Sequence, residues 1–199
     1  MTRPFVLGLT GSIGMGKSTT AEFFRAAGIP VWDADAAVHR AYGPGGAAVE
    51  AIGVLHPAAA GPEGVDRAAL RRWIAADPSA LARIEAVVHP IVAQDRARFL
   101  GEHAGADLVV LDIPLLFETG GDTWVDAVLV VTAPPEVQRA RVLARPGMTP
   151  AALDALLAKQ MPDAQKRARA DHVIETVGLD EVRADVAALI ARIRRDRHA

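Results

Sequence analysis

A glycine-rich segment near the N-terminus has the residue types and spacing of a phosphate-binding loop. Gly11-Ser12-Ile13-Gly14-Met15-Gly16-Lys17-Ser18 fits the pattern G-x-x-x-x-G-K-[ST] at every position, and Thr19 follows it. Glycine lets backbone amides approach phosphate oxygens and adopt positive φ angles. In this pattern Lys17 contacts the β- and γ-phosphates and the Ser18 hydroxyl binds magnesium. We therefore expect residues 11–19 to bind ATP or GTP. The glycine spacing does not fit the dinucleotide pattern G-x-G-x-x-G.

Two acidic residues follow an expected strand at residues 29–32. Asp33 and Asp35 are two positions apart, so in an extended segment their side chains would point the same way. A small-molecule kinase needs one carboxylate to orient the acceptor hydroxyl and accept its proton, and others to hold hydrated magnesium. Helix capping is the alternative role, because aspartate is favoured at that position. One aspartate could also cap while the other serves catalysis.

Two further acids end apolar segments in the middle of the chain. Asp112 follows the run at residues 108–111, which is the Walker B pattern, in which the acid positions magnesium through Ser18 or a water. Glu118 follows residues 114–117 and could contact a ligand or cap a helix. We expect Ser18 to be the metal ligand for Mg2+, with Asp33 and Asp112 acting through water.

Basic side chains gather in a helical segment at residues 139–170. Arg141 and Arg145 are four residues apart and share one helix face. A mobile lid would bring such guanidinium groups onto the phosphates and exclude water, whereas a solvated helix face is the alternative. His89, next to Pro90, is either structural or binds a second substrate's phosphate together with Asp35. We expect Asp35, Lys17, Arg141 and Arg145 to be the catalytic residues.

These groups must be positioned by an α/β fold, in which helices cover both faces of a parallel sheet. Apolar runs predict strands at residues 5–10, 29–32, 108–111, 125–132 and 172–174. A helix is expected from Gly16 to Gly28, and another should carry the apolar stripe at residues 182–193. Strands that alternate with helices and are apolar on both faces indicate a parallel sheet.

Two segments interrupt this alternation. Residues 36–106 contain no convincing strand, and His89-Pro90 lies between two of its helical stripes. Residues 139–170 are helical, with breaks at Pro146-Gly147 and Pro162. We predict a single three-layer P-loop NTPase domain over residues 1–199, with its core at 1–35, 107–138 and 171–199. A helical acceptor-binding insertion at about 36–106 and a helical lid at about 139–170 would lie at the carboxyl edge of the sheet.

Composition and charge limit the possible partners. The formal net charge is −2, so no global basic field attracts nucleic acid or anionic lipid. The absence of cysteine excludes disulfides and thiolate chemistry. The N-terminus lacks the pattern of a signal peptide, and no apolar run approaches the ~20 residues that span a bilayer. We expect a cytoplasmic protein with no nucleic-acid, membrane or obligate protein partner.

With these segments assembled, the chain resembles the bacterial dephospho-CoA kinase family, which performs the last step of coenzyme A synthesis. The resemblance rests, in chain order, on Leu9–Thr19, Asp33–Asp35, Val88–Pro90, Asp112–Glu118, the lid residues 141–160 and Arg169–Ile174. It implies a P-loop kinase core with a helical substrate-binding domain and a lid. It also implies transfer of the γ-phosphoryl of ATP, with Mg2+, to the ribose 3′-hydroxyl of dephospho-CoA. Asp35 matches the family's catalytic aspartate, and Asp33, His89, Leu116 and Glu118 match segments that line its acceptor site.

Two positions depart from the family pattern. Thr176-Val177-Gly178 stands where the family often has Asn-Ser-Gly near the adenine, and Lys166 stands where many relatives carry arginine. The lysine keeps the charge but loses the planar fork of a guanidinium. Two alternative functions remain. One is another P-loop kinase for a small molecule or nucleotide. The other is a nucleotide-dependent switch protein. The chain lacks an Asn-Lys-x-Asp guanine motif, which argues against this alternative.

Overall fold

The computed structural model describes residues 3–198, which form two compact units. One unit contains the chain up to Trp32 and again from His103, and the other contains Asp33–Glu102. The helical unit therefore begins slightly earlier than the insertion predicted at 36–106, and it includes both Asp33 and Asp35. Within residues 3–198, no helix is long and apolar enough to cross a membrane.

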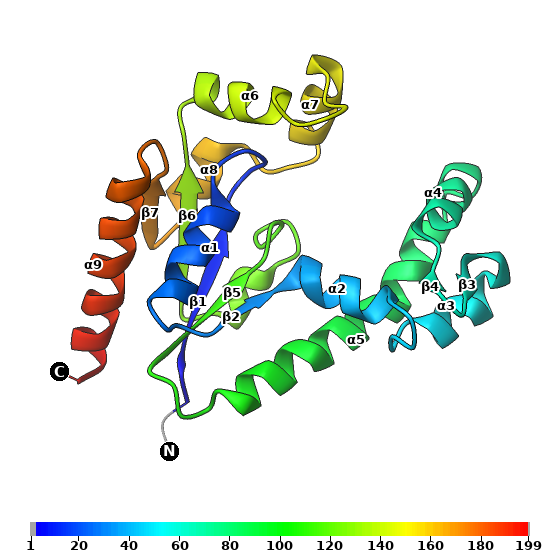
Figure 1. Cartoon of the computed structure of the whole chain (residues 1–199), viewed down its shortest axis with the longest axis horizontal. Coiled ribbons are helices and arrows are strands. Elements are labelled where there is room, and N and C mark those ends of the chain that lie inside the picture. The colour runs from blue at the N-terminus through cyan, green and yellow to red at the C-terminus, as the bar shows by residue number, and fades with distance from the viewer. Residues whose placement is uncertain (1–2, 199) are drawn as a thin grey trace. The chain divides into compact units, whose positions relative to one another are not determined.

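A five-stranded sheet with the order β2-β5-β1-β6-β7 forms the centre of the first unit (Figure 1). Its strands are β1 (Phe5–Thr10), β2 (Val31–Asp33), β5 (Leu108–Asp112), β6 (Ala127–Thr132) and β7 (His172–Glu175). β1 pairs in parallel with β5 and β6, and β6 pairs in parallel with β7. The strand expected from Val125 starts two residues later, because the carboxylate of Asp126 accepts the N–H of Val6 at 2.8 Å. The predicted α/β class is confirmed.

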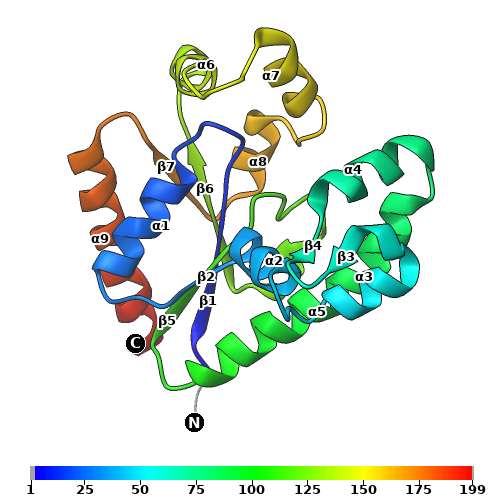
Figure 2. The same ribbon diagram turned by 45° about the vertical axis from the view of Figure 1, so that its right-hand side comes forward.

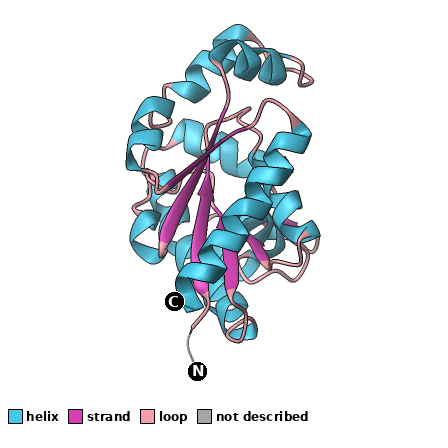
Figure 3. Ribbon diagram, turned by 90° about the vertical axis from the view of Figure 1, so that its left-hand side faces the viewer, coloured by secondary structure: helices cyan, strands magenta, loops and turns pink. Residues whose placement is uncertain are grey.

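The sheet buries apolar side chains on both faces, as the apolar runs predicted. Leu7 and Leu9 of β1 point into a core shared with α1 (Lys17–Ala26) and α9 (Leu179–His198), which pack side by side (Figure 2). Val109 and Leu111 of β5 alternate with the residues of that core and are also fully buried. The predicted stripe on α9 is confirmed and comprises Val182, Val186, Leu189, Ile190 and Ile193. Figure 3 shows the strands enclosed between helices.

Three helices between β6 and β7 form a segment that we call the arm, residues 135–169. They are α6 (Pro135–Leu143), α7 (Pro150–Leu157) and α8 (Asp163–Arg169). Gly147 lies between the first two with a φ of 74°, and Pro162 immediately precedes α8, so both predicted breaks are present. The arm begins at Pro135 rather than near Arg139, since proline is favoured in the first turn of a helix. α6 and α7 lie beyond the carboxyl end of β6 (Figure 1).

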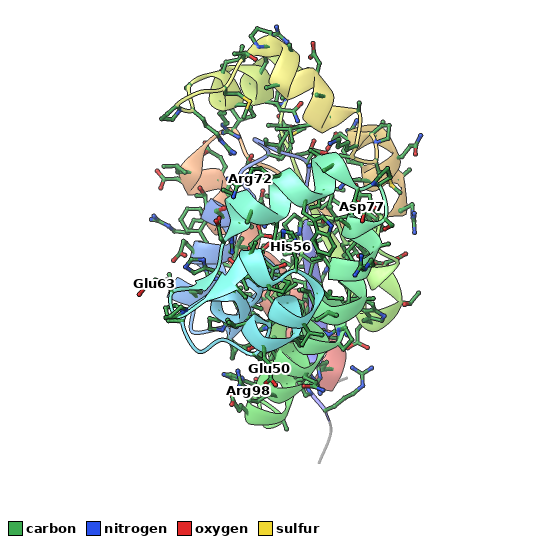
Figure 4. The ribbon with its side chains drawn as sticks, turned by 90° about the vertical axis from the view of Figure 1, so that its right-hand side faces the viewer. Glu50, His56, Glu63, Arg72, Asp77 and Arg98 are labelled. Atoms are coloured by element: carbon green, nitrogen blue, oxygen red, sulfur yellow. The ribbon has the colours of Figure 1, made fainter. Side chains whose placement is uncertain are left out.

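The helical unit contains α2 (Ala34–Tyr42), α3 (Val49–Leu55), η1 (Pro57–Ala59), α4 (Arg67–Ala76) and α5 (Ala80–Glu102). The expectation that this segment contains no strand was wrong. A short hairpin of β3 (Ala60–Gly61) and β4 (Gly64–Val65) is present, with Glu63 pointing outward from its turn (Figure 4). Pro90 does not divide two helices, because α5 continues through it. Proline removes only one amide donor, and Ile84 and Val88 anchor this helix in the unit's core.

Candidate functional site

The predicted phosphate loop connects β1 to α1 and has the backbone that anion binding requires. Gly14 and Gly16 have φ angles of 79° and 81°, in the left-handed region that favours glycine. The amide of Met15 donates to the carbonyl of Ser12 at 3.1 Å, which closes the turn. No side chain caps the N-terminus of α1, so its first amides are available to an anion. The first turn of α1 contains no acidic residue that would repel an anion.

Lys17 and Asp112 meet at the carboxyl edge of the sheet. Nζ of Lys17 lies 2.5 Å from Oδ1 of Asp112, whose side chain is only 2% exposed. The pairing follows from the register, since Leu9 is opposite Asp112 and the loop follows β1 directly. The predicted Walker B position is therefore adjacent to the phosphate loop.

The oxygen donors near this loop suit magnesium. Ser18 is exposed in the first turn of α1, and Asp112 offers a carboxylate beside Lys17. In the part of the chain that the structure describes, no group of three acidic or histidine side chains could enclose a metal ion. Magnesium fits such a sparse set, because it keeps several waters and takes its other ligands from phosphates.

The two aspartates of Asp33-Ala34-Asp35 do not lie in an extended segment. Asp33 ends β2 and caps α2, where its Oδ1 accepts the N–H of Ala36 at 2.9 Å. Asp35 is an exposed residue in the first turn of that helix. The extended segment on which the expectation of parallel side chains rested is therefore absent, because Asp33 caps a helix that begins at Ala34. Capping by one aspartate leaves the other free for chemistry.

The remaining residues expected near the acceptor have different environments. His89 is exposed on α5. Leu116 is fully buried and contacts the backbone of the sheet, since a Cβ on Gly8 would lie 2.9 Å from its Cδ2. The structure gives Leu116 a packing role, and its contact with an acceptor stays a prediction.

Glu118 joins the segment after β5 to the arm. Its Oε1 accepts the N–H of Met161 at 2.8 Å and lies 2.8 Å from Nζ of Lys166. The Lys166 side chain is completely buried, and its ammonium meets Glu118 at ion-pair distance without the angle of a regular hydrogen bond. Burial favours a higher pKa for the Glu118 carboxyl, but Lys166 and the Met161 amide outweigh it and hold that pKa below its usual value. Glu118 is therefore an ionised anchor for the arm rather than a helix cap.

Arg141 and Arg145 occupy different positions on the arm. Arg141 donates from Nη1 to Oγ1 of Thr176 at 3.0 Å and from Nη2 to the Thr176 carbonyl. Arg145, one turn further along the chain, is exposed. Both stay candidates for phosphate contacts.

The sequence did not reveal the role of three polar residues. Thr176 is buried and donates through Oγ1 to the carbonyl of Met15 at 2.9 Å. The threonine that stands where the family often has asparagine therefore joins the end of β7 to the phosphate loop. Gln138 and Gln160, from the arm, both bond to the backbone of Ile13. A neutral amide in a basic helical segment follows no spacing rule, so no pattern could have singled them out.

Comparisons with known proteins agree with this geometry. A family model for dephospho-CoA kinase matches residues 5–181. A dephospho-CoA kinase of Cereibacter sphaeroides is 65% identical over 192 residues, which cover 96% of this chain and 97% of that protein. One from a Jannaschia species is 60% identical, over 95% of this chain and 97% of that protein.

Among solved structures, TT1252 from Thermus thermophilus is 39% identical with a TM-score of 0.84, covering 96% of this chain and 98% of that one. A dephospho-CoA kinase from Campylobacter jejuni, 21% identical with a TM-score of 0.65 and covering 94% and 96%, shares the fold. The chain belongs to the dephospho-CoA kinase family.

Proposed function

We propose that the protein transfers the γ-phosphoryl group of ATP to the ribose 3′-hydroxyl of dephospho-CoA and so forms coenzyme A. The observation that carries the proposal is the ion pair of Lys17 and Asp112 beside an uncapped phosphate loop. Membership of the dephospho-CoA kinase family supports the acceptor. A cytoplasmic location and the absence of an obligate partner stay predictions.

The phosphate loop and the arm act on the nucleotide in this proposal. The amides of residues 14–18 surround the β-phosphate, and Lys17 exchanges its contact with Asp112 for the β- and γ-phosphates. Ser18 would hold magnesium directly, and Asp112 and Asp33 would hold it through water, where the metal would supply positive charge next to the phosphates. Arg141 and Arg145 approach the transferred group from the arm. These fixed charges stabilise the transition state because they require little reorganisation during transfer.

The acceptor is oriented by the helical unit. Asp35 accepts the proton of the 3′-hydroxyl while that oxygen attacks the γ-phosphorus. The bond from the γ-phosphorus to the β–γ bridging oxygen then breaks, and ADP leaves. Asp35 suits this role because it is exposed while Asp33 is occupied with capping. His89 and Glu118 are proposed to contact the acceptor.

A cavity within the helical unit supports an acceptor-binding role for it. Its volume is about 420 Å³, and it lies between α2 and α5. Arg40 and Arg98 both contact Asp95 there, at 2.7 and 2.8 Å. Its lining combines small apolar and polar side chains, namely Ala37, Arg40, Ala41, Ala47, Ile91, Gln94, Asp95 and Arg98. Such a mixed surface suits part of a long ligand with apolar and polar groups.

ADP release with ATP and a panel of acceptors tests the proposal. Dephospho-CoA should stimulate release, whereas shikimate, gluconate and nucleoside monophosphates should not. Mass spectrometry should detect coenzyme A as the product. Nucleotide binding without acceptor-dependent ADP release would instead favour a switch protein, and stimulation by a different acceptor would favour another kinase.

A further inference from the structure

Both backbone hydrogen-bonding groups of Ile13 are bound by glutamine side chains of the arm. The N–H of Ile13 donates to Oε1 of Gln160 at 3.1 Å, and its carbonyl accepts from Nε2 of Gln138 at 2.8 Å. An N–H must meet an amide oxygen and a carbonyl must meet an amide NH2, so these contacts fix the orientation of both glutamine amides. Ile13 is the third residue of the phosphate loop.

These two bonds restrain consecutive peptide groups. The N–H of Ile13 belongs to the peptide that joins it to Ser12, and its carbonyl belongs to the peptide that joins it to Gly14. Gly14 has a φ of 79° and, as glycine, could adopt many other conformations. The two glutamines therefore limit rotation where the loop has the least intrinsic stiffness, directly before the amides that face a phosphate.

The two glutamines come from different parts of the arm, one before α7 in the chain and one after it. Gln138 is buried on α6, which packs so closely on the loop that a Cβ on Gly14 would lie 2.5 Å from Cγ2 of Val142. Gln160 lies after α7 and before α8. Figures 1 and 2 both show the loop after β1 close to the arm. The arm thus holds one residue of the loop at two points, one on α6 and one between α7 and α8.

We propose that Gln138 and Gln160 are positioning residues that hold the phosphate loop in its nucleotide-binding conformation and couple it to the arm. Glutamate could not replace either without loss. At position 138 it would lack the donor for the Ile13 carbonyl, and at position 160 it would place a negative charge beside an anion-binding loop. The inference rests on the proposed function only in that the loop binds the phosphates of ATP.

Isosteric variants test the proposal through nucleotide binding. Gln138→Met and Gln160→Met keep the length of the side chain and remove its hydrogen-bonding group. The loss of one hydrogen bond should weaken binding of Mg-ADP, measured by calorimetry, about three- to tenfold. KM for dephospho-CoA should change less than twofold. Gln165→Met is the matched control, because Gln165 is exposed on α8 and its side chain makes no hydrogen bond in the described chain.

The double variant separates positioning from simple packing. Because both bonds restrain the same loop residue, the combined loss in Mg-ADP affinity should differ from the product of the two single losses. Hydrogen exchange in residues 12–16 should also be faster in each variant than in the parent, because the loop is less restrained. Unchanged Mg-ADP affinity in both single variants, with only a lower melting temperature, would overturn the proposal. A parent protein that binds Mg-ADP but does not phosphorylate dephospho-CoA would refute the proposed function and leave this test intact.

Discussion

Nζ of Lys17 lies 2.5 Å from Oδ1 of Asp112, although the two residues are 95 positions apart in the chain. The parallel pairing of β1 with β5 brings them together, since Asp112 ends β5 and the loop that leads to Lys17 follows the neighbouring β1 at the same edge of the sheet. The carboxylate is almost completely buried, so it fixes the lysine ammonium next to the uncapped end of α1. A cation held in this position is preorganised for phosphate.

Replacement of Lys17 should abolish most of the transfer. Lys17→Ala removes the charge that contacts the β- and γ-phosphates, and the turnover number should fall by about 10²–10³. ADP release with dephospho-CoA measures the effect, and circular dichroism checks that the fold is kept. Lys159→Ala, an exposed lysine of the arm, should retain the parent's activity. Activity of Lys17→Ala within about threefold of the parent would contradict the assignment.

Asp112 should act mainly through magnesium. Asp112→Asn keeps the size of the side chain and removes its charge, so both the hydrated metal and Lys17 lose their anionic partner. The magnesium concentration for half-maximal activity should rise about 10- to 100-fold. Titration of activity with magnesium at saturating ATP provides the measurement. An unchanged magnesium dependence would show that Asp112 only anchors Lys17.

Asparagine variants should distinguish the roles of Asp33, which caps α2, and Asp35, which lies in its first turn. Asp35→Asn removes the proton acceptor, and turnover should fall by the low end of the ~10²–10⁴ typical of general bases, since phosphoryl transfer needs little base help. ATP affinity should stay nearly unchanged. Asp33→Asn should keep the helix cap and shift the magnesium dependence, with extra magnesium restoring part of the activity.

A third variant controls for stability in this comparison. Asp33→Ala removes the cap and should lower the free energy of unfolding by about 1 kcal/mol, whereas Asp33→Asn should not. Urea unfolding distinguishes them. Near-normal turnover of Asp35→Asn would contradict this division of roles. If Asp33→Asn were then inactive, Asp33 would be the proton acceptor and Asp35 the residue that acts on magnesium.

The pairing of Glu118 with Lys166 should make stability depend on pH. Glu118→Gln leaves a fully buried ammonium without its counterion, and should cost about 3 kcal/mol of unfolding free energy at pH 7. Because the pKa of Glu118 is lowered in the folded state, the contribution is fully present above the ordinary value of 4.5 and is lost as pH falls through the lower folded value. The parent and the variant should therefore converge in acid.

Urea unfolding of both proteins between pH 7 and pH 3.5 measures this convergence. Glu22→Gln is the control, since Glu22 forms an exposed ion pair with Arg25 and should change the free energy by less than about 1 kcal/mol. A difference between Glu118→Gln and the parent that stays constant across this range would show that packing, not charge, accounts for the loss.

The sequence by itself determined the phosphate loop, the strands of the five-stranded sheet and the acid at the end of β5. These depend on local rules, namely glycine at positions of positive φ, β-branched runs that are buried on both sides, and an acid where a strand ends. The stripe on α9 was equally readable because helical spacing places its apolar residues on one face. Resemblance over nearly the whole chain supplied the acceptor, which no spacing rule indicates.

Only the tertiary structure decided which polar groups meet. The spacing of Asp33 and Asp35 did not show which of them caps a helix, and the cap on Ala36 gives the two residues different environments. Glu118 and Lys166 are 48 residues apart, and Gln160 reaches Ile13 across 147 positions. Such contacts depend on the path of the arm, which folds back onto the phosphate loop after β6. A contact between two single residues produces no periodic pattern in the sequence that could predict it. The lysine at position 166 is tolerated inside the protein because folding places a carboxylate against it.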